Sequence, residues 1–371
     1  MSSKNFDIYF DYGSSKSRAA AINKSDIKKN FYCESNFYLN HSEKESEIEK
    51  IISTIEKNTN EYLDNINLMF DSSKIISVSL SLKKNLDGSK LKKEDVQFVI
   101  QDAKQQILRN YSNQSIIHIV IQNYKINNEN YSYLPGDIDC NSLSIDIVFI
   151  CLAKKIVSDL KIIFSKFDIS LNQIFISSYT KAANYKDNFI SSKNLSFIDM
   201  GFNKTSVTSY YDDQIIFFEV IPVGSNHVTK DISKILNIDL TTAEKIKLNF
   251  DADDNYLEEN KISFDLVENI IFARLEEILE LCNKPIQQNK NLDTLSKLKI
   301  VLTGEGSKIL NDNFKNKISF SDEIDLLEET PESICESALK LNMGINRQEV
   351  VVVPKKQIKE GFFEKLFHMF E

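Results

Sequence analysis

Short apolar runs alternate with amphipathic stretches along the whole chain, which is the pattern of an α/β fold. Apolar or alternating runs predict strands at residues 6–10, 19–22, 75–82, 116–122, 144–151, 173–176, 214–221 and 299–303. Apolar positions at helical spacing predict helices at residues 44–63, 93–107, 155–164, 178–185, 228–236, 241–247, 267–282 and 330–343. Residues 83–89 are polar and predict a boundary, and residues 127–141 predict a loop.

One local pattern occurs twice, namely a strand that ends in Asp-x-Gly, followed by a polar turn and a second strand. The first copy contains Asp11 and Gly13, and the second contains Asp199 and Gly201. An aspartate at a strand end can reach a metal ion, and a glycine after it lets backbone approach a phosphate. A single copy could be an ordinary surface hairpin. The repetition favours a duplicated fold that holds a nucleotide between its halves.

The polar turn of the first copy contains donors for a phosphate. Ser14 and Ser15 can donate hydrogen bonds to phosphate oxygens, and Lys16 can neutralise their charge. Gly224 stands just before a predicted helix, where it is either a further phosphate contact or a plain turn before the helix.

Two later segments have weaker signals. Thr241 could cap a helix, with Glu244 three residues on as the acid of a capping box. The strand at residues 299–303 runs into Gly304-Glu305-Gly306-Ser307. Two glycines at this spacing would let a flat ligand such as a purine lie against the backbone.

The composition indicates a soluble globular protein that does not have nucleic acid as its main partner. The 371 residues can form two domains, and 42% of them are hydrophobic. The net charge is −9 and no basic stretch stands out, so nothing predicts a surface that follows a phosphate backbone. The five cysteines form no CxxC pair, which is typical of reduced thiols in a cytoplasm.

Residues 346–359 predict a polar linker, and residues 360–371 predict an amphipathic helix that attaches to a membrane. Its apolar face would consist of Phe362, Phe363, Leu366, Phe367, Met369 and Phe370. The alternative is that this helix packs back onto the body of the protein.

Taken together, these motifs resemble the FtsA family of bacterial cell-division proteins, within the actin, Hsp70 and sugar-kinase superfamily. The resemblance covers nearly the full length. The matching segments are Asp11–Lys16 and Asp199–Gly201 for the two phosphate motifs, Leu302–Ser307 for the adenosine motif, Pro222–Ile232, and Ala243–Lys247.

The resemblance implies an actin-like, RNase H-like duplicated two-domain fold with an inserted subdomain and a C-terminal amphipathic helix. It implies subdomain 1A at residues 1–82 and 155–193, the inserted subdomain 1C at 83–154, subdomain 2A at 194–244 and 298–345, and subdomain 2B at 245–297.

The resemblance also implies an adaptor that binds ATP with Mg²⁺, forms filaments, and tethers FtsZ to the inner face of the cytoplasmic membrane at the division site. Its partners would be the C-terminal peptide of FtsZ, captured by subdomain 2B, other division proteins and membrane lipid. The implied nucleotide-binding residues are Gly13, Ser14, Ser15, Lys16, Gly201, Asn203, Lys204, Thr205, Gly224, Glu244, Lys247, Gly304, Glu305, Gly306 and Ser307. Asp11 and Asp199 would hold Mg²⁺, directly or through water.

The chain departs from the family pattern in two of the three nucleotide motifs, the second phosphate motif and the adenosine motif. Residues 202–206 lack the glycines and the later acid that the second phosphate motif usually contains, and Glu305 replaces a glycine. These departures favour ATP binding with weak or absent hydrolysis. Two alternatives are an active ATPase or phosphotransferase on the same fold, and the actin-like adaptor of pilus assembly.

Overall fold

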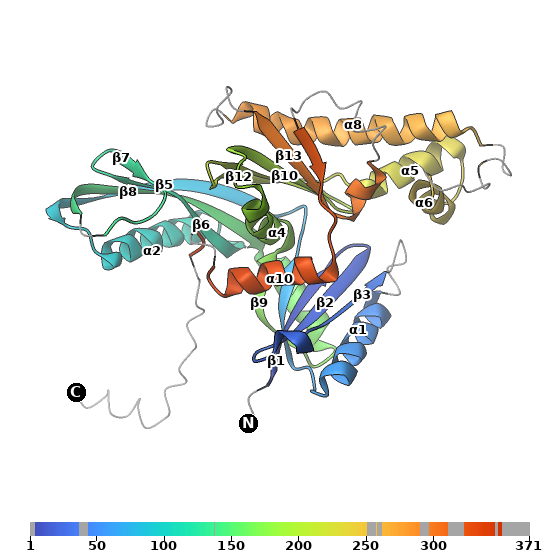
Figure 1. The fold of residues 1–371 in the computed structure, drawn as a ribbon, viewed down its shortest axis with the longest axis horizontal. Helices are drawn as coiled ribbons and strands as arrows, with labels where there is room; N and C mark the ends of the chain where they lie inside the picture. The colour runs from blue at the N-terminus through green and yellow to red at the C-terminus, as the bar shows by residue number, and fades with distance from the viewer. Residues whose placement is uncertain are drawn as a thin grey trace.

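The computed structural model describes residues 4–36, 44–136, 138–250, 257, 262–289, 297–310, 323–345 and 348–350. These residues form an actin-like α/β fold built on three separate sheets, with helices packed against each of them (Figure 1). In this part of the chain, no helix is both long enough and apolar enough to span a membrane. The tail predicted to bind a membrane lies outside the described residues.

The first two sheets repeat one topology. The first has the order β3-β2-β1-β4-β9, and the second has the order β12-β11-β10-β13-β14. In each sheet the first two pairs of neighbouring strands in this order are antiparallel, and the last two pairs are parallel. The strands of the first sheet are β1 (Phe6–Tyr12), β2 (Lys16–Asn23), β3 (Phe31–Asn36), β4 (Asn65–Phe70) and β9 (Ser170–Ile176). Those of the second are β10 (Asn194–Met200), β11 (Thr205–Tyr211), β12 (Gln214–Ile221), β13 (Leu298–Thr303) and β14 (Glu323–Leu326).

The third sheet is antiparallel and has the order β5-β8-β6-β7. It extends to one side of the other two in Figure 1, and its strands contact β9 of the first sheet and β12 of the second. It follows β4 in the chain, and its own core forms against helix α2 (Lys93–Asn110). Its strands are β5 (Ile76–Lys90), β6 (Gln114–Ile126), β7 (Glu129–Tyr131) and β8 (Asp139–Ala153).

The other helices cover the first two sheets and join them. Helices α5, α6 and α8 share a core with one face of the second sheet, while α4 and α10 pack against each other. Helix α10 follows the second sheet in the chain but contacts strands β1 and β2 of the first. These helices are α1 (Lys44–Thr59), α3 (Lys154–Ser165), α4 (Ser177–Tyr185), α5 (Ser225–Leu236), α6 (Leu240–Leu248), α8 (Phe264–Gln288) and α10 (Pro331–Asn342), with short 3-10 helices η1 (Ile27–Lys29), η3 (Lys186–Phe189) and η4 (Glu305–Ile309).

The structure corrects several local predictions. Residues 83–89 lie inside the long strand β5, although their polar composition predicts a boundary, because one face of this strand is open to solvent. The predicted loop at residues 127–141 contains strand β7 and the start of β8. Helix α6 begins after Asp239, whose side chain accepts from the Thr242 N–H at 2.9 Å, so Thr241 is not the cap.

Candidate functional site

The parallel strands of both sheets end at one place. Asp11 lies at the end of β1, Asp71 follows β4, and Ser177 follows β9. From the second sheet, Asp199 lies at the end of β10 and Gly304 follows β13. Open α/β sheets bind ligands outside the carboxyl ends of their strands, so this is the expected position of a ligand site.

Asp11 is buried and held by two neighbours from its own half of the protein. One carboxylate oxygen accepts from the Ser177 hydroxyl at 2.8 Å, and the other accepts from the Arg18 guanidinium at 3.2 Å. Burial by itself would lower the pKa of Arg18, but Asp11 and Glu305 raise it above its ordinary value. The guanidinium is therefore a permanent cation beside Asp11.

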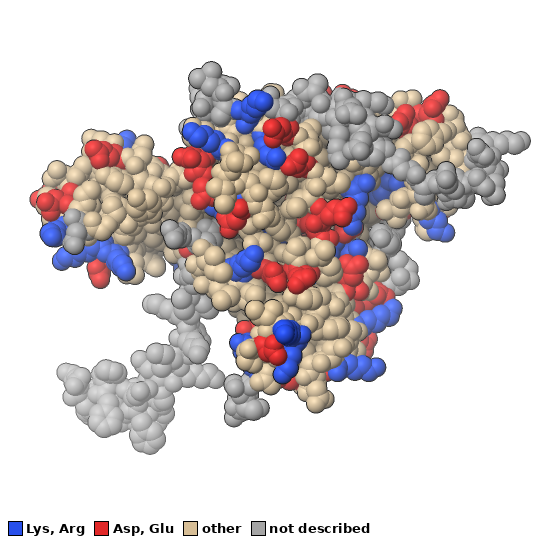
Figure 2. Space-filling view, viewed as in Figure 1, with Lys and Arg blue, Asp and Glu red and all other residues tan. Residues whose placement is uncertain are grey.

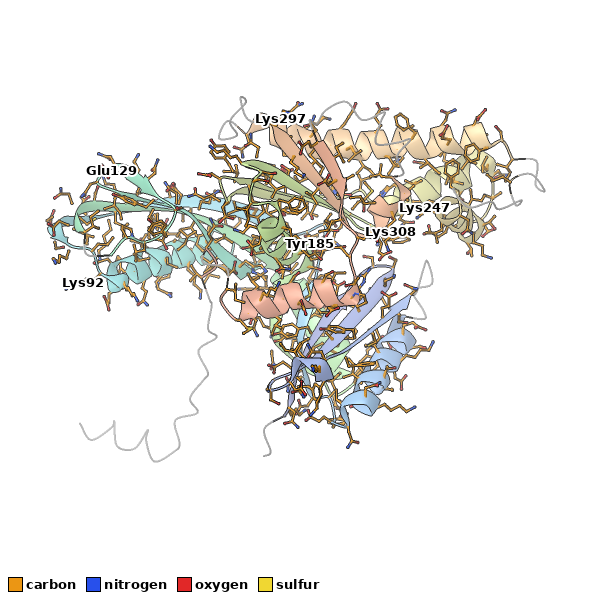
Figure 3. The ribbon with its side chains drawn as sticks, in the orientation of Figure 1. Lys92, Glu129, Tyr185, Lys247, Lys297 and Lys308 are labelled. Atoms are coloured by element: carbon orange, nitrogen blue, oxygen red, sulfur yellow. The ribbon has the colours of Figure 1, made fainter. Side chains whose placement is uncertain are left out.

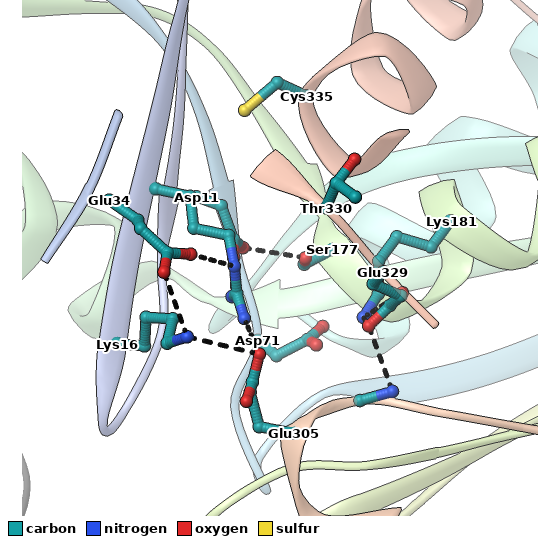
Figure 4. A network of polar contacts seen from close by, with 12 residues as sticks. Asp11, Lys16, Glu34, Asp71, Ser177, Lys181, Glu305, Glu329, Thr330 and Cys335 are labelled. Atoms are coloured by element: carbon teal, nitrogen blue, oxygen red, sulfur yellow. Dashed lines mark hydrogen bonds and ion pairs between the residues drawn. The ribbon is translucent and has the colours of Figure 1, made fainter. Parts of the chain in front are cut away.

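A buried lysine joins the two halves. Lys181 on α4 lies 2.8 Å from Asp199 of the second sheet and 2.9 Å from Glu329, which precedes α10. Glu329 also accepts from the Gly304 N–H at 3.0 Å. Burial favours the neutral lysine, but the two carboxylates raise the pKa of Lys181 well above its ordinary value. Figure 4 shows Lys181 and Glu329 of this cluster in one view with Asp11.

Two cavities lie along this line of side chains. We call them the inner cavity, of about 70 Å³, and the outer cavity, of about 240 Å³. The inner cavity is lined from both halves by Asp11, Tyr12, Gly13, Ser14, Ser15, Lys16, Arg18, Asp71, Ser177, Lys181, Asp199, Gly201, Phe202, Lys204, Gly304, Glu305 and Glu329. The outer cavity is lined by Ser15, Lys16, Phe202, Ser225, Glu244, Lys247, Leu248, Phe250, Glu305, Lys308 and Ile309.

The inner cavity has the chemistry of a phosphate site. The first hairpin brings serine hydroxyls and the ammonium group of Lys16, and the second brings Lys204. A side chain at Gly13 would place its Cβ only 2.3 Å from the carbonyl oxygen of Lys16, so the tight first turn requires glycine.

The outer cavity combines apolar side chains with one buried ion pair. Glu244 and Lys247 lie 2.7 Å apart, and Lys247 also donates to the Thr229 hydroxyl at 2.9 Å. Burial lowers the pKa of Lys247, and Glu244 opposes this shift. In Figure 3, Lys247 and Lys308 lie on the side of the second sheet where α5, α6 and η4 meet. A flat ring would find apolar contact and polar partners here.

Five predicted contacts shape the turns without lining either cavity. Asn203 accepts from Asn226, Thr205 donates to the carbonyl of Val223, and Ser307 donates to the carbonyl of Gly304. A Cβ on Gly224 would lie 2.5 Å from the carbonyl oxygen of Gly201, and one on Gly306 would lie 2.7 Å from that of Met200. The glycines therefore let α5 and η4 close against the second turn. The other predicted nucleotide-contacting residues all line one cavity or both.

Comparison with known proteins agrees with the predicted family. The family model of the cell division protein FtsA matches residues 196–301. The cell division protein FtsA of Agrobacterium fabrum is 23% identical over 244 residues, which cover 61% of this chain and 54% of that protein. The FtsA of Buchnera aphidicola from Acyrthosiphon pisum is 23% identical over 315 residues, covering 76% of this chain and 74% of that protein. The resemblance to FtsA is confirmed.

The fold also has a solved counterpart. A chain of the PilM-PilN type IV pilus biogenesis complex matches with a TM-score of 0.63 and 10% identity, covering 94% of this chain and 100% of that one. At this identity the likeness shows the fold alone. The first FtsA relative is matched over about half of its own length, so the activity and partners of a complete FtsA are proposals for this chain.

The motifs identified in the sequence did not include several residues that line the inner cavity. Asp71 follows β4, a short buried strand that the sequence analysis did not predict; its carboxylate accepts from the Ser178 N–H and hydroxyl. Burial raises the pKa of Asp71 above its ordinary value. Lys181 and Glu329 were missed because neither stands in a local motif. A polar residue directly after each buried parallel strand is the signal that would have found Asp71 and Ser177.

The carboxylates of the inner cavity bear on whether this site could hold Mg²⁺. In the part of the chain that the structure describes, no group of three or more His, Cys, Asp or Glu side chains could hold a metal ion. Mg²⁺ needs fewer protein ligands, because it keeps several waters and commonly uses one or two carboxylates with substrate phosphates. Asp11 and Asp199 both line the inner cavity and are already paired with cations, which fits contact through water.

Proposed function

We propose that this chain is an ATP-binding, actin-like adaptor of bacterial cell division. The observation that carries the proposal is the pair of adjoining cavities at the strand ends, which share Ser15, Lys16, Phe202 and Glu305. The phosphates would occupy the inner cavity, with Mg²⁺ reached through water from Asp11 and Asp199. The adenosine would occupy the outer cavity, between the Glu244–Lys247 pair and residues 304–309.

The adaptor role rests on the FtsA resemblance. The chain would capture the C-terminal peptide of FtsZ through residues 245–297, assemble into filaments with other copies, and meet other division proteins at the cytoplasmic face of the inner membrane. The surface supports a protein partner more than a nucleic acid. Figure 2 shows acidic and basic side chains interspersed over the visible face, without a basic stripe.

Nucleotide binding is tested with a fluorescent ATP analogue and the variant Asp199→Ala. Asp199 is 12% exposed and is one of two carboxylates that neutralise Lys181, so its loss disturbs the inner cavity directly. We expect ATP affinity and filament formation to fall together. The control is Asp7→Ala, because Asp7 forms an exposed ion pair with Lys24 at the far end of β1. Unchanged ATP affinity in Asp199→Ala would remove the inner cavity from the proposal.

Membrane attachment is tested by deleting residues 361–371 and sedimenting the protein with anionic lipid vesicles. The full chain should pellet with vesicles, and the truncated chain should stay in solution while still binding ATP. A truncated chain that still pellets would contradict the tail assignment. A full chain that does not pellet would instead favour the pilus-assembly alternative, which needs a membrane-bound protein partner.

The enzyme alternative has one observation in its favour. Asp71 is a carboxylate of raised pKa that lines the inner cavity, where a base for hydrolysis would have to lie. Its oxygens already accept from Ser178, so we favour a structural role at the start of α4. Turnover of several per second that is lost in Asp71→Asn would support the enzyme instead.

A further inference from the structure

The carboxylate of Glu305 is surrounded by three cations. It lies 2.5 Å from the Arg18 guanidinium, 3.1 Å from the ammonium of Lys308 and 3.4 Å from that of Lys16. Arg18 and Lys16 belong to β2 in the first sheet, while Glu305 and Lys308 belong to η4, which follows strand β13 of the second sheet. One side chain therefore links the two halves of the protein across the site (Figure 4).

Glu305 also stands where the two cavities adjoin, since it lines both of them together with Lys16. A ligand that extends from one cavity to the other must pass this carboxylate. Burial raises the pKa of Glu305, but the attraction of Arg18 and Lys16 outweighs burial, and the pKa lies below its ordinary value. The carboxylate is therefore ionised at neutral pH.

Two of the three cations are those that a polyphosphate would need. Lys16 and Arg18 both line the inner cavity, and charge-assisted bonds from such groups are the main source of affinity for phosphate oxygens. While they hold Glu305, these bonds are not available to a ligand. A carboxylate here thus provides the negative charge that a phosphate would otherwise bring.

We propose that Glu305 is a built-in anion that occupies the phosphate-binding cations and closes the cleft when no nucleotide is bound. This inference rests on the proposed nucleotide function. ATP must displace the carboxylate from Lys16 and Arg18, which weakens the contribution of the phosphates to affinity but leaves that of adenosine intact. Glu305 therefore sets how strongly the site distinguishes ATP from adenosine.

Glu34 offers a matched control. It approaches the same two cations, at 3.3 Å from Lys16 and 3.7 Å from Arg18, and is 39% exposed. Glu34 belongs to β3, and both of its partners belong to β2 of the same sheet, so it does not link the halves. It is not among the described residues that line either cavity. Glu34→Gln removes the same charge from the same neighbours without opening the site.

The first experiment measures the affinities of adenosine, ADP and ATP by calorimetry for the natural chain, Glu305→Gln and Glu34→Gln. Since charge-assisted bonds are freed, Glu305→Gln should bind ATP about tenfold more tightly, ADP by a smaller factor, and adenosine within about twofold. Glu34→Gln should change ATP affinity by less than about threefold. Equal gains in both variants, or no gain in Glu305→Gln, would overturn the proposal. Weaker adenosine binding in Glu305→Gln would also overturn it, because the carboxylate would then be a ligand for the nucleoside.

The second experiment measures amide hydrogen exchange without nucleotide. Residues 11–18 and 304–309 should exchange faster in Glu305→Gln than in Glu34→Gln, and saturating ATP should restore their protection. Equal exchange in the two variants would refute the link between the halves. If the natural chain binds neither adenosine nor ATP, the nucleotide function fails, and the exchange experiment still decides whether Glu305 closes the cleft.

Discussion

Lys181 provides the sharpest test of how the two halves are held together. The variant Lys181→Met keeps the length of the side chain and removes its charge. Lys181 is 8% exposed, Asp199 is 12% exposed and Glu329 is 5% exposed, so two carboxylates would remain buried without their cation. Removing one member of such a cluster is strongly destabilising, because the remaining charges have lost their solvation.

The expected magnitude follows from the geometry. At 2.8 and 2.9 Å and an effective dielectric constant of about 20, each attraction is roughly 6 kcal/mol. Desolvation of the three ions, at several kcal/mol each, offsets much of this sum. Loss of Lys181 should therefore lower the free energy of unfolding by about 3–5 kcal/mol.

The assay is urea unfolding followed by circular dichroism, since the chain contains no tryptophan for fluorescence. The control is Lys166→Met, because Lys166 pairs with Glu45 at 2.5 Å with both side chains at least half exposed. That loss should stay under about 1 kcal/mol. The double variant Lys181→Met, Glu329→Gln should recover part of the loss. Equal stability of the Lys181 and Lys166 variants would refute the assigned role of the buried cluster.

Three further outcomes follow from the same structure. Gly224→Ala should destabilise the protein by at least about 1–3 kcal/mol in thermal unfolding and abolish ATP binding, because the added Cβ would overlap the second turn. Gly136→Ala should be neutral in the same assay, because nothing lies within 4 Å of the Cβ added there. Burial raises the pKa of Glu305, but Arg18 and Lys16 outweigh burial and lower the pKa below its ordinary value. The stability that this carboxylate adds is therefore present above the ordinary pKa of a glutamate and is lost as the pH falls through the folded-state pKa. A stability difference from Glu305→Gln that grows on acidification would contradict this. Lys247→Met should cost about 3–5 kcal/mol in chemical denaturation, because it leaves the buried Glu244 carboxylate with the Thr229 hydroxyl but without its cation. Lys247→Met, Glu244→Gln should be more stable than the single variant.

Much of the fold could be predicted from local patterns. The alternating and apolar runs identified most strands, and the repeated Asp-x-Gly hairpins indicated two similar sheets. Strand β4 was missed because its apolar residues directly follow the predicted helix at residues 44–63, and a short apolar run cannot be told from a buried helix segment by periodicity alone. The boundary predicted at residues 83–89 was wrong, because β5 continues through these residues, which are polar on an exposed strand.

The sequence by itself determined the turns of the site. At Gly13 a Cβ would overlap the backbone of its own turn, so only glycine is compatible and the requirement is local. At Gly224 the overlap is with the turn at Gly201, so that requirement comes from the tertiary structure. The tertiary structure decided the electrostatics. Lys181 and Glu329 are 148 positions apart, and Arg18 and Glu305 are 287 positions apart, yet each pair is in contact. These contacts exist because parallel strands from both sheets end at one place, and no local pattern records which distant charges will meet there.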